Sequence, residues 1–194
     1  MEREVERRLV ARVKSGEAAA FEIVYQTYRA RLFSFLIRLS RRRDVAEDLL
    51  EETWLRLVAC APRLSDETYL AAWLFTVARN LHASWCRHRA VDETRIAEPP
   101  ASWPAPAAGE TPFEAAARTE TERRLERALA RLSVRDREVL LLVAVEELAP
   151  SDAAAVMGLR AEALRKRLQR ARERLATEMD AVGGFAHEGS GGRR

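Results

Sequence analysis

The sequence predicts an all-α protein made of two small helical domains joined by a flexible linker. Ala, Leu, Arg and Glu dominate its 194 residues, and these residue types favour helices. On both sides of one proline-rich segment, apolar residues recur at spacings of three and four, as on the buried faces of packed helices. The proline-rich segment cannot sustain a helix, so it divides the chain into two modules.

The composition also limits the classes of function. Charged residues make up 32 % of the chain, and the small net charge of +3 conceals blocks of opposite sign. No apolar run reaches the length of a membrane span, and the charged N-terminus is a helix start, not a signal peptide. Cys60 and Cys86 provide no disulfide framework, so we expect a reduced, cytoplasmic protein. The sequence carries no phosphate-binding loop and no nucleophile motif, so we expect no enzyme activity, no cofactor and no small-molecule substrate.

The first predicted domain, residues 1–95, is helical throughout. A helix over residues 18–40 is expected to bury one face, which carries Phe21, Val24, Tyr25, Tyr28, Leu32 and Leu36. Asp44 and Glu47 have the spacing of a capping box, so Asp44 is predicted to cap the next helix. That helix, over residues 45–60, is expected to bury some combination of Leu49, Trp54, Leu57 and Val58. Pro62 and the polar residues after it interrupt the chain.

The segment 73–89 carries two contrasting faces at helical spacing. One is an apolar stripe formed by Trp73, Val77, Leu81 and Trp85. The other is a polar row formed by Arg79, Asn80, Ala83 and Arg87. Aromatic anchors below and an Arg/Asn/Arg row above suit a nucleic-acid surface, because the row can meet phosphates and base edges. Taken alone, the segment also fits an ordinary amphipathic helix with a solvated basic face.

The same segment contains a His-x-x-x-Cys-x-His pattern, formed by His82, Cys86 and His88. His and Cys four residues apart share one helix face, which is the geometry of a transition-metal pair. No carboxylate is placed to complete the site, and a continuous helix would aim His88 elsewhere. We therefore expect chance neighbours in a basic helix, with no bound metal.

Residues 96–114 are predicted to form a Pro/Ala-rich linker. Five prolines with Ala and Gly between them bury little surface and cannot sustain a helix. Such a linker implies two modules that move relative to each other. Within it, Trp103 is predicted to be a docking contact, because a lone Trp is rarely left exposed by chance.

The second predicted domain, residues 115–181, contains a helix-turn-helix. An amphipathic helix marked by Leu125, Ala128, Leu129 and Leu132 precedes the apolar run 139–145. Ser151 is then predicted to cap a short helix in which Ala154 allows close approach, and Gly158 to end it in a tight turn. A second helix follows, anchored by Leu159, Leu164 and Leu168. The tail from residue 182 to residue 194 is expected to be disordered.

The second helix of this pair is strongly basic. It carries Arg165, Lys166, Arg167, Arg170, Arg172 and Arg174 against two glutamates. An αα-hairpin without a DNA role is the alternative, because glycine turns between helices are common. So concentrated a positive charge favours duplex DNA as the partner.

Taken together, the motifs of the two modules resemble the extracytoplasmic-function (ECF) sigma factors of the sigma-70 family of bacterial RNA polymerase. In the first module these are Asp-Leu-Leu-Glu-Glu-Thr-Trp at 48–54 and Trp-Leu-Phe-Thr-Val-Ala-Arg-Asn at 73–80. In the second they are Leu-x-x-x-x-Arg-Glu at 132–138 and Arg-Leu-x-Arg-Ala-Arg-x-Arg-Leu at 167–175. The resemblance covers about four-fifths of the chain, with sigma region 2 in the first module and region 4 in the second.

That resemblance implies a sigma factor that binds core RNA polymerase, directs it to promoters and assists promoter melting. The implied contacts with the polymerase clamp helices are Asp48, Leu49, Glu52 and Leu55. The implied contacts with the −10 element are Arg79, Asn80, Ala83, Arg87, Ser65 and Asp66, the last two in a loop that captures a flipped-out base. The implied contacts with the −35 element are Arg160, Glu162, Arg165, Lys166, Gln169 and Arg170. An anti-sigma factor is implied as a further partner.

Two positions depart from the family pattern, and two other functions fit the motifs. Glu51 stands where the family commonly has Gln, and Ser84 where it usually has Asp, so the detailed contacts are expected to differ. One alternative function is an autonomous helix-turn-helix regulator whose first module senses a ligand or dimerises. Another is a helical adaptor that binds only proteins.

Overall fold

The computed structural model describes residues 3–92 and 119–184, and every regular element within these ranges is a helix. The predicted all-α class is therefore confirmed. The chain folds as two compact units, with α1 to α4 in the first and α6, α7 and α9 in the second. The predicted linker at 96–114, including Trp103, lies outside the described residues. None of the described helices combines the length and hydropathy that a membrane span needs.

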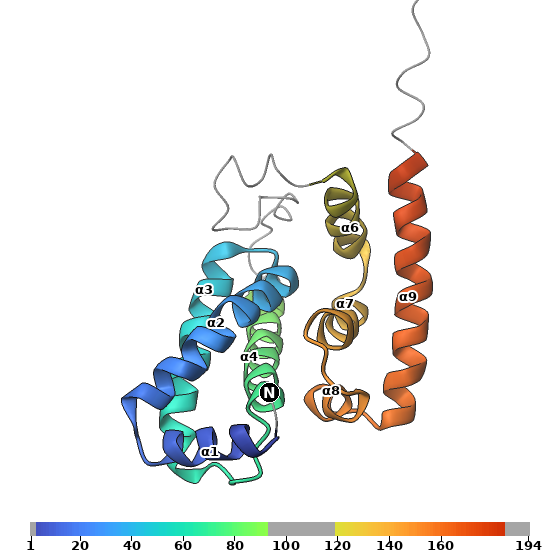
Figure 1. Cartoon of the computed structure of the whole chain (residues 1–194). Coiled ribbons are helices and arrows are strands. Elements are labelled where there is room, and N and C mark those ends of the chain that lie inside the picture. The colour runs from blue at the N-terminus through green and yellow to red at the C-terminus, as the bar shows by residue number, and fades with distance from the viewer. Residues whose placement is uncertain (1–2, 93–118, 185–194) are drawn as a thin grey trace, which may run out of the picture. The chain divides into compact units, whose positions relative to one another are not determined.

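Four helices form the first unit (Figure 1): α1 (Arg3–Lys14), α2 (Ala18–Ser40), α3 (Arg43–Cys60) and α4 (Leu70–Asp92). A short 3-10 helix, η1 (Ala61–Arg63), and the loop 64–69 connect α3 to α4. Helices α2, α3 and α4 pack on one another, while α1 packs on α2 and on η1. The N-terminal helix α1 therefore meets the α3–α4 connection, although the two are far apart in the sequence.

The core of this unit follows the predicted apolar periodicity of α2. Val24, Tyr28, Leu32 and Leu36 are buried, and Phe21 and Tyr25 are half-buried, as expected for one continuous face. Phe35 adds an edge-to-face contact with Phe75 of α4, with ring centroids 5.2 Å apart. This contact joins α2 to the helix that carries the predicted −10 residues.

The start of α3 differs from the prediction. Arg42, in an extended conformation, precedes the helix, and no side chain caps its N-terminus. Asp44 lies inside the first turn, where its carboxylate accepts hydrogen bonds from the Arg42 guanidinium. Glu47 pairs with Arg43 at 2.6 Å and does not reach back to a cap. The predicted capping box is wrong, because both carboxylates have nearer partners in this arginine-rich turn.

The second unit contains α6 (Glu120–Arg131), α7 (Val134–Leu140), the π-helical continuation η2 (Leu141–Val145) and α9 (Ala161–Gly184). Between η2 and α9 the chain forms α8 (Pro150–Met157), of which residues 150–154 belong to this unit. Helices α6 and α7 both pack on the long helix α9 (Figure 1). A capping box begins α6: the Thr119 hydroxyl accepts from the Glu122 amide, and the Glu122 carboxylate accepts from the Thr119 amide. Ala128, Leu129 and Leu132 are buried as predicted, whereas Leu125 is exposed.

Buried Arg137 fixes the turn between α6 and α7. Its guanidinium donates to the carbonyl of Leu129 at 2.9 Å, of Ala130 at 3.2 Å and of Leu132 at 3.0 Å. These carbonyls lie at the C-terminal end of α6, where the helix provides no further i+4 amides, although Leu129 also accepts from the amide of Leu132 at 3.2 Å. The guanidinium of Arg137 thus provides hydrogen-bond donors for the C-terminal carbonyls of α6. The same bonds stabilise the angle between α6 and α7.

The helix-turn-helix has the predicted turn at Gly158, but its first helix begins earlier than predicted. Gly158 adopts a left-handed φ of 64°, and the next amide, of Leu159, donates to the carbonyl of Ala154 at 2.9 Å. Leu164 and Leu168 are buried as predicted. Helix α8 begins at Pro150, so the predicted cap at Ser151 is wrong: Ser151 lies inside the first turn, which proline suits as a starting residue. At the other end α9 continues to Gly184, so residues 182–184 are helical.

Candidate polymerase and nucleic-acid interfaces

One face of α3 combines acidic and exposed apolar side chains. Leu55 is 57 % exposed and Val58 is 59 % exposed, although both are large hydrophobic residues. Asp48, Glu51 and Glu52 precede Leu55 by one or two helical turns, which places them on the same face of the helix. Exposed apolar residues rimmed by charge are typical of a protein-binding surface. The acidic rim suits a basic partner.

The structure separates the two leucines of the predicted polymerase contact. Leu55 points to solvent, but Leu49 is only 8 % exposed and belongs to the core of the first unit. The burial of Leu49 agrees with the core position that the apolar periodicity predicted, but leaves no exposed side chain for the polymerase contact that the resemblance implied. Val58, predicted as a possible core residue, is exposed instead and extends the face that Leu55 begins. The outward apolar pair of α3 is Leu55 and Val58.

Helix α4 buries a different stripe from the one that its aromatic residues predict. The predicted anchors Trp73, Val77, Leu81 and Trp85 are all half-buried. Within the segment 73–89 the fully buried positions are Leu74, Phe75, Ala78 and His82. Histidine is a weak marker of burial in a sequence, and the prediction followed the prominent tryptophans of the neighbouring stripe instead.

The predicted polar row of α4 lies on one side of the helix, away from this core. Asn80 and Arg87 are exposed, and Arg79 and Ala83 are half-buried. Their positions along the helix keep all four within a narrow sector of its surface. Arg79 has an interaction with another group, so Asn80 and Arg87 offer the more accessible donors of the row.

His82 is a core residue of α4. It is 1 % exposed, and its ring stacks on Trp85 with centroids 6.0 Å apart. Its Nε2 atom lies 3.6 Å from Sγ of Cys86, whereas His88 is exposed. Among residues 3–92 and 119–184, no group of three His, Cys, Asp or Glu side chains could hold a metal ion.

The loop before α4 is a compact turn. The Ser65 hydroxyl accepts from the amide of Glu67 at 3.3 Å, and the Ser65 carbonyl accepts from the amide of Thr68 at 3.0 Å. Asp66 is exposed, but its carboxylate is paired with Lys14 of α1. Tyr69, at the end of the loop, is 40 % exposed. An exposed aromatic ring can stack on an unpaired base, which Ser65 and Asp66 cannot do.

Most of the predicted −35 residues lie on the exposed face of α9, opposite the buried Leu164 and Leu168. This face carries Glu162, Arg165, Lys166, Gln169 and Arg170, all exposed. Arg160 is exposed too but precedes the helix. Glu162 pairs with Lys166 at 2.7 Å, and Gln169 donates to Glu173 at 3.1 Å. Arg165 and Arg170 make no ion pair with any residue that the structure describes.

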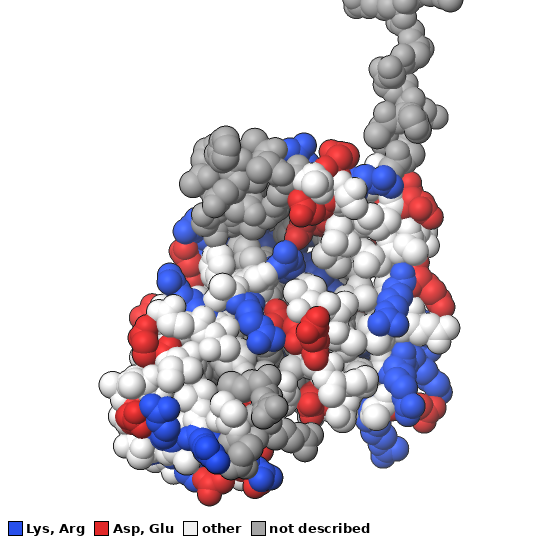
Figure 2. Space-filling view, in the orientation of Figure 1, with Lys and Arg blue, Asp and Glu red and all other residues white. Residues whose placement is uncertain are grey.

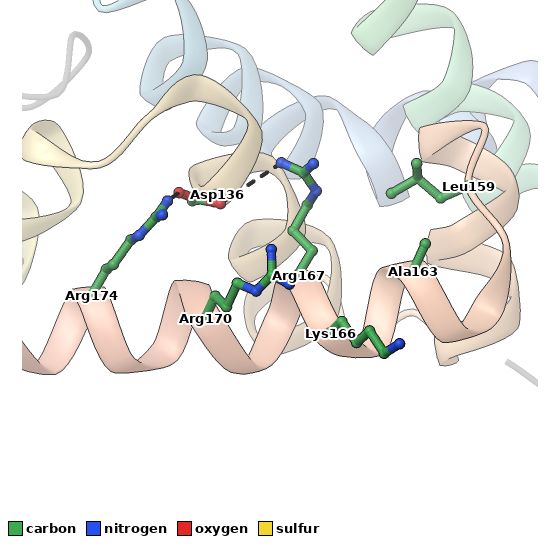
Figure 3. A pocket seen from close by; sticks show the side chains of 7 residues that line it. All are labelled: Asp136, Leu159, Ala163, Lys166, Arg167, Arg170 and Arg174. Atoms are coloured by element: carbon green, nitrogen blue, oxygen red, sulfur yellow. Dashed lines mark hydrogen bonds and ion pairs between the residues drawn. The ribbon is translucent and has the colours of Figure 1, made fainter.

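A pocket of about 360 Å³ lies beside this face (Figure 3). Its basic lining comes from Lys166, Arg167, Arg170 and Arg174. Asp136, from α7, is 4 % exposed and lies between Arg174, which donates to it, and Arg167, at 3.8 Å. One buried carboxylate therefore engages two of the four cations, while Lys166 and Arg170 line the same pocket without pairing with Asp136. Figure 2 shows Lys and Arg side chains gathered over this part of α9.

Comparison with known protein families accounts for both units. The family model Sigma-70 region 2 matches residues 24–91, and Sigma-70, region 4, matches residues 122–175. The ECF RNA polymerase sigma factor EcfG of Rhodopseudomonas palustris is 34 % identical over 145 residues, which cover 75 % of this chain and 77 % of EcfG. The chain belongs to the ECF sigma factors of the sigma-70 family. The resemblance inferred from the motifs is confirmed.

Other ECF sigma factors match over a larger share of the chain. ECF RNA polymerase sigma factor SigC of Mycobacterium tuberculosis is 30 % identical, covering 85 % of this chain and 86 % of SigC. Among solved structures, the sigma factor RpoE of Bartonella quintana, in complex with the anti-sigma factor NepR, superposes with a TM-score of 0.66. It is 29 % identical and covers 82 % of this chain and 96 % of its own. CnrH, at 24 % identity and a TM-score of 0.67, shares the fold and covers 90 % of this chain and 97 % of its own.

Sequence reasoning missed three residues that shape the two regions of this sigma factor. Val58 was considered as a possible core residue although it is exposed, and the pairing of Asp136 with two arginines of α9 had no signal in the sequence. Arg137 was noted only as part of a motif. A buried Arg could have been suspected from its place in the first turn after the Ser133 cap, close to the end of α6, but its three carbonyl partners depend on tertiary packing.

Proposed function

We propose that this ECF sigma factor binds core RNA polymerase through α3, opens the −10 element with α4 and the loop 64–69, and reads the −35 element with α9. The observation that carries the proposal is the match of region 2 and region 4, in that order, to two separately packed units of one chain. We place the protein in the cytoplasm, where the polymerase acts, and assign it no chemical reaction.

The polymerase contact is assigned to the exposed face of α3. Leu55 and Val58 would provide the buried centre of the interface, and Asp48, Glu51 and Glu52 its charged rim. Apolar centres contribute most of the affinity of such interfaces, whereas charged rims steer the encounter. Clamp helices rich in arginine would complement both parts. Leu49 supports this face from inside the core without touching the partner.

The −10 contacts are assigned to the polar row of α4 and to the loop 64–69. Asn80 and Arg87 can donate to bases and phosphates, and Tyr69 can stack on a base that has left the duplex. Capture of such a base stabilises the open strands, because the lost stacking within DNA is replaced by stacking on protein. Asp66, which is paired with Lys14, is assigned a role in the loop's shape and not in base contact.

The −35 contacts are assigned to the exposed face of α9. Arg165 has no ion-pair partner in the part of the chain that the structure describes and lies one turn into the helix, so it is placed to donate two hydrogen bonds to a guanine. Arg170 lies further along, beside the basic pocket, where a phosphate would be the matching group. An anti-sigma factor, as in the complex of RpoE with NepR, would cover the exposed faces of α3 and α9 until a signal releases them.

Two experiments test the proposal. The full chain should co-purify with core polymerase and support transcription from promoters selected by the holoenzyme. Asn80→Ala should leave the closed complex nearly intact but slow strand opening, measured by permanganate reactivity of unpaired thymines. Specific footprints made by the chain without polymerase would contradict the proposal and support an autonomous regulator. That alternative is not favoured, because it leaves the region 2 match of the first unit unexplained.

A further inference from the structure

The loop 64–69 is fastened to helix α1 by three polar contacts. The Glu6 carboxylate accepts a hydrogen bond from the amide of Leu70 at 2.9 Å. Arg7 pairs with Glu67, and Lys14 pairs with Asp66. The partners are separated by 52 to 64 residues in the sequence, so these are tertiary contacts. They join the N-terminal helix to the one loop of the first unit that is assigned to DNA.

The three contacts differ in strength. Glu6 is 4 % exposed, and its partner is the first amide of α4, which has no acceptor within the helix. A carboxylate at a helix N-terminus is stabilised both by this charge-assisted bond and by the helix dipole. The Arg7 and Lys14 pairs are exposed, so each contributes little to stability. Glu6 therefore determines where α4 begins and where the loop ends.

The two exposed ion pairs reduce the negative charge of the loop. Asp66 and Glu67 place two carboxylates beside a surface that has to approach DNA, and both carboxylates point to solvent. Unpaired, they would repel the phosphate backbone. Arg7 and Lys14 offset both charges from α1. The loop thus meets DNA as a nearly neutral surface.

We infer that α1 positions the loop 64–69 for capture of an unpaired −10 base, and that Glu6 governs base selection there without contacting DNA. This role rests on the proposed function of the loop. Displacement of the first turn of α4 would move Tyr69, the base-stacking candidate, which precedes Leu70 directly. Glu6 is a positioning residue, acting through the backbone of Leu70.

The test uses holoenzyme assembled from core polymerase and the full chain, and fluorescent single-stranded oligonucleotides of a selected promoter's −10 element. Each base is replaced in turn. Glu6→Ala should reduce discrimination at the captured position by about tenfold, the effect expected of one lost buried hydrogen bond. Glu6→Gln keeps a side-chain oxygen that can accept from Leu70 and should restore most of the selectivity. Glu22→Ala removes the same charge from an exposed site on α2 and should match the wild type.

A second pair of variants covers the case in which Glu6→Ala unfolds the first unit, judged by circular dichroism. Arg7→Glu places two carboxylates together on the surface and should slow strand opening, and the reciprocal exchange with Glu67→Arg should restore it. Unchanged opening in Arg7→Glu, or wild-type selection in a folded Glu6→Ala, would overturn the role of α1. If Tyr69→Ala also leaves selection unchanged, the loop itself does not capture a base. If only Tyr69→Ala alters selection, the loop function stands and the role of α1 fails.

Discussion

The cations of α9 are divided between paired and unpaired side chains, and this division determines what each can do. Lys166 is engaged by Glu162, and Arg167 and Arg174 by Asp136. Arg165 and Arg170 are exposed and have no ion-pair partner among the described residues. Arg172 is likewise exposed and without an ion-pair partner among the described residues. A guanidinium without a partner in the protein can offer all five of its donors and its uncompensated charge to DNA, whereas a paired one offers fewer donors and a partly neutralised charge. These unpaired arginines, Arg165 and Arg170 first among them, are therefore expected to dominate contact with the duplex.

Arg165→Ala and Arg170→Ala are expected to have different effects on DNA binding by the holoenzyme. A bidentate contact to guanine is directional, so Arg165→Ala should lose about 1–3 kcal/mol of discrimination at one base pair of the −35 element. Arg170→Ala should weaken binding to all sequences alike and reduce the salt slope by about one unit, as expected for a phosphate contact. Equal weakening of every sequence by Arg165→Ala would show that this residue does not read a base.

Asp136→Asn should have two opposite consequences. Loss of a buried carboxylate that binds two guanidinium groups should lower the free energy of unfolding of the second unit by about 2 kcal/mol. Release of Arg167 and Arg174 should at the same time increase non-specific duplex affinity and steepen its salt dependence. Asp180→Asn is the matched control, because it changes the charge by the same amount at an exposed position on α9. If the two variants have the same melting temperature and salt slope, Asp136 does not restrain these arginines.

Tyr28 is expected to make the first unit sensitive to high pH. Burial, and then the negative charge of Glu6, raise the pKa of Tyr28 to about 12 from an ordinary value of 10. The unfolded chain therefore loses this proton at lower pH than the folded chain, so stability falls as pH rises from about 10 to about 12. A shift of this size corresponds to about 3 kcal/mol. Tyr28→Phe should remove this part of the loss of stability. Denaturant titrations of both proteins at a series of pH values measure the difference.

At the scale of the element, α3 has two faces with different functions. Leu49 and Leu57 face the core, while Leu55 and Val58 face solvent. The acidic residues of the helix precede this outward pair by one or two turns. In the proposed interface, the inward leucines hold the helix in the fold and the outward pair would be recognised by the polymerase. Stability and binding can be changed separately on a single helix.

Leu55→Ser should retain the stability of the first unit within about 0.5 kcal/mol, because the side chain is exposed. Its affinity for core polymerase should fall about thirtyfold, as for loss of an interface hot spot of about 2 kcal/mol. Leu49→Ser should instead destabilise the fold by about 3 kcal/mol, because it empties a buried site. Ile23→Ser, at an exposed site on α2, is the control for a change of surface hydrophobicity. Full co-purification of folded Leu55→Ser with polymerase would show that the interface lies elsewhere.

At the scale of the whole molecule, the proposed function divides the DNA contacts between two small units. Each unit is assigned a short surface for DNA, and neither surface alone contacts both promoter elements. A large partner that holds both units raises the effective concentration of the second contact once the first has formed. The free chain should therefore bind duplex DNA weakly at physiological salt and gain promoter specificity only with core polymerase. Footprinting with and without polymerase, at matched salt, measures the difference, and a tight specific footprint by the free chain would contradict it.

The sequence was sufficient to predict the structure wherever a local pattern of residues determines a buried face or a turn. The spacing of Val24, Tyr28 and Leu32 determines the buried face of α2, and Gly158 determines the turn of the helix-turn-helix, because only glycine readily adopts its backbone angles. The exposed face of α9 follows in the same way from the positions of Leu164 and Leu168. Helical periodicity therefore predicted the fold and most of the residues assigned to DNA.

Tertiary structure alone decided which of two neighbouring stripes α3 and α4 bury and which charges are paired. Leu49 rather than Leu55 entered the core of α3, and His82 rather than Trp85 became fully buried in α4, because burial depends on what the other helices place opposite. The partners of Glu6 and Asp136 lie 64 and 38 residues away along the chain. No local pattern encodes such distant contacts, since they exist only after the helices have packed.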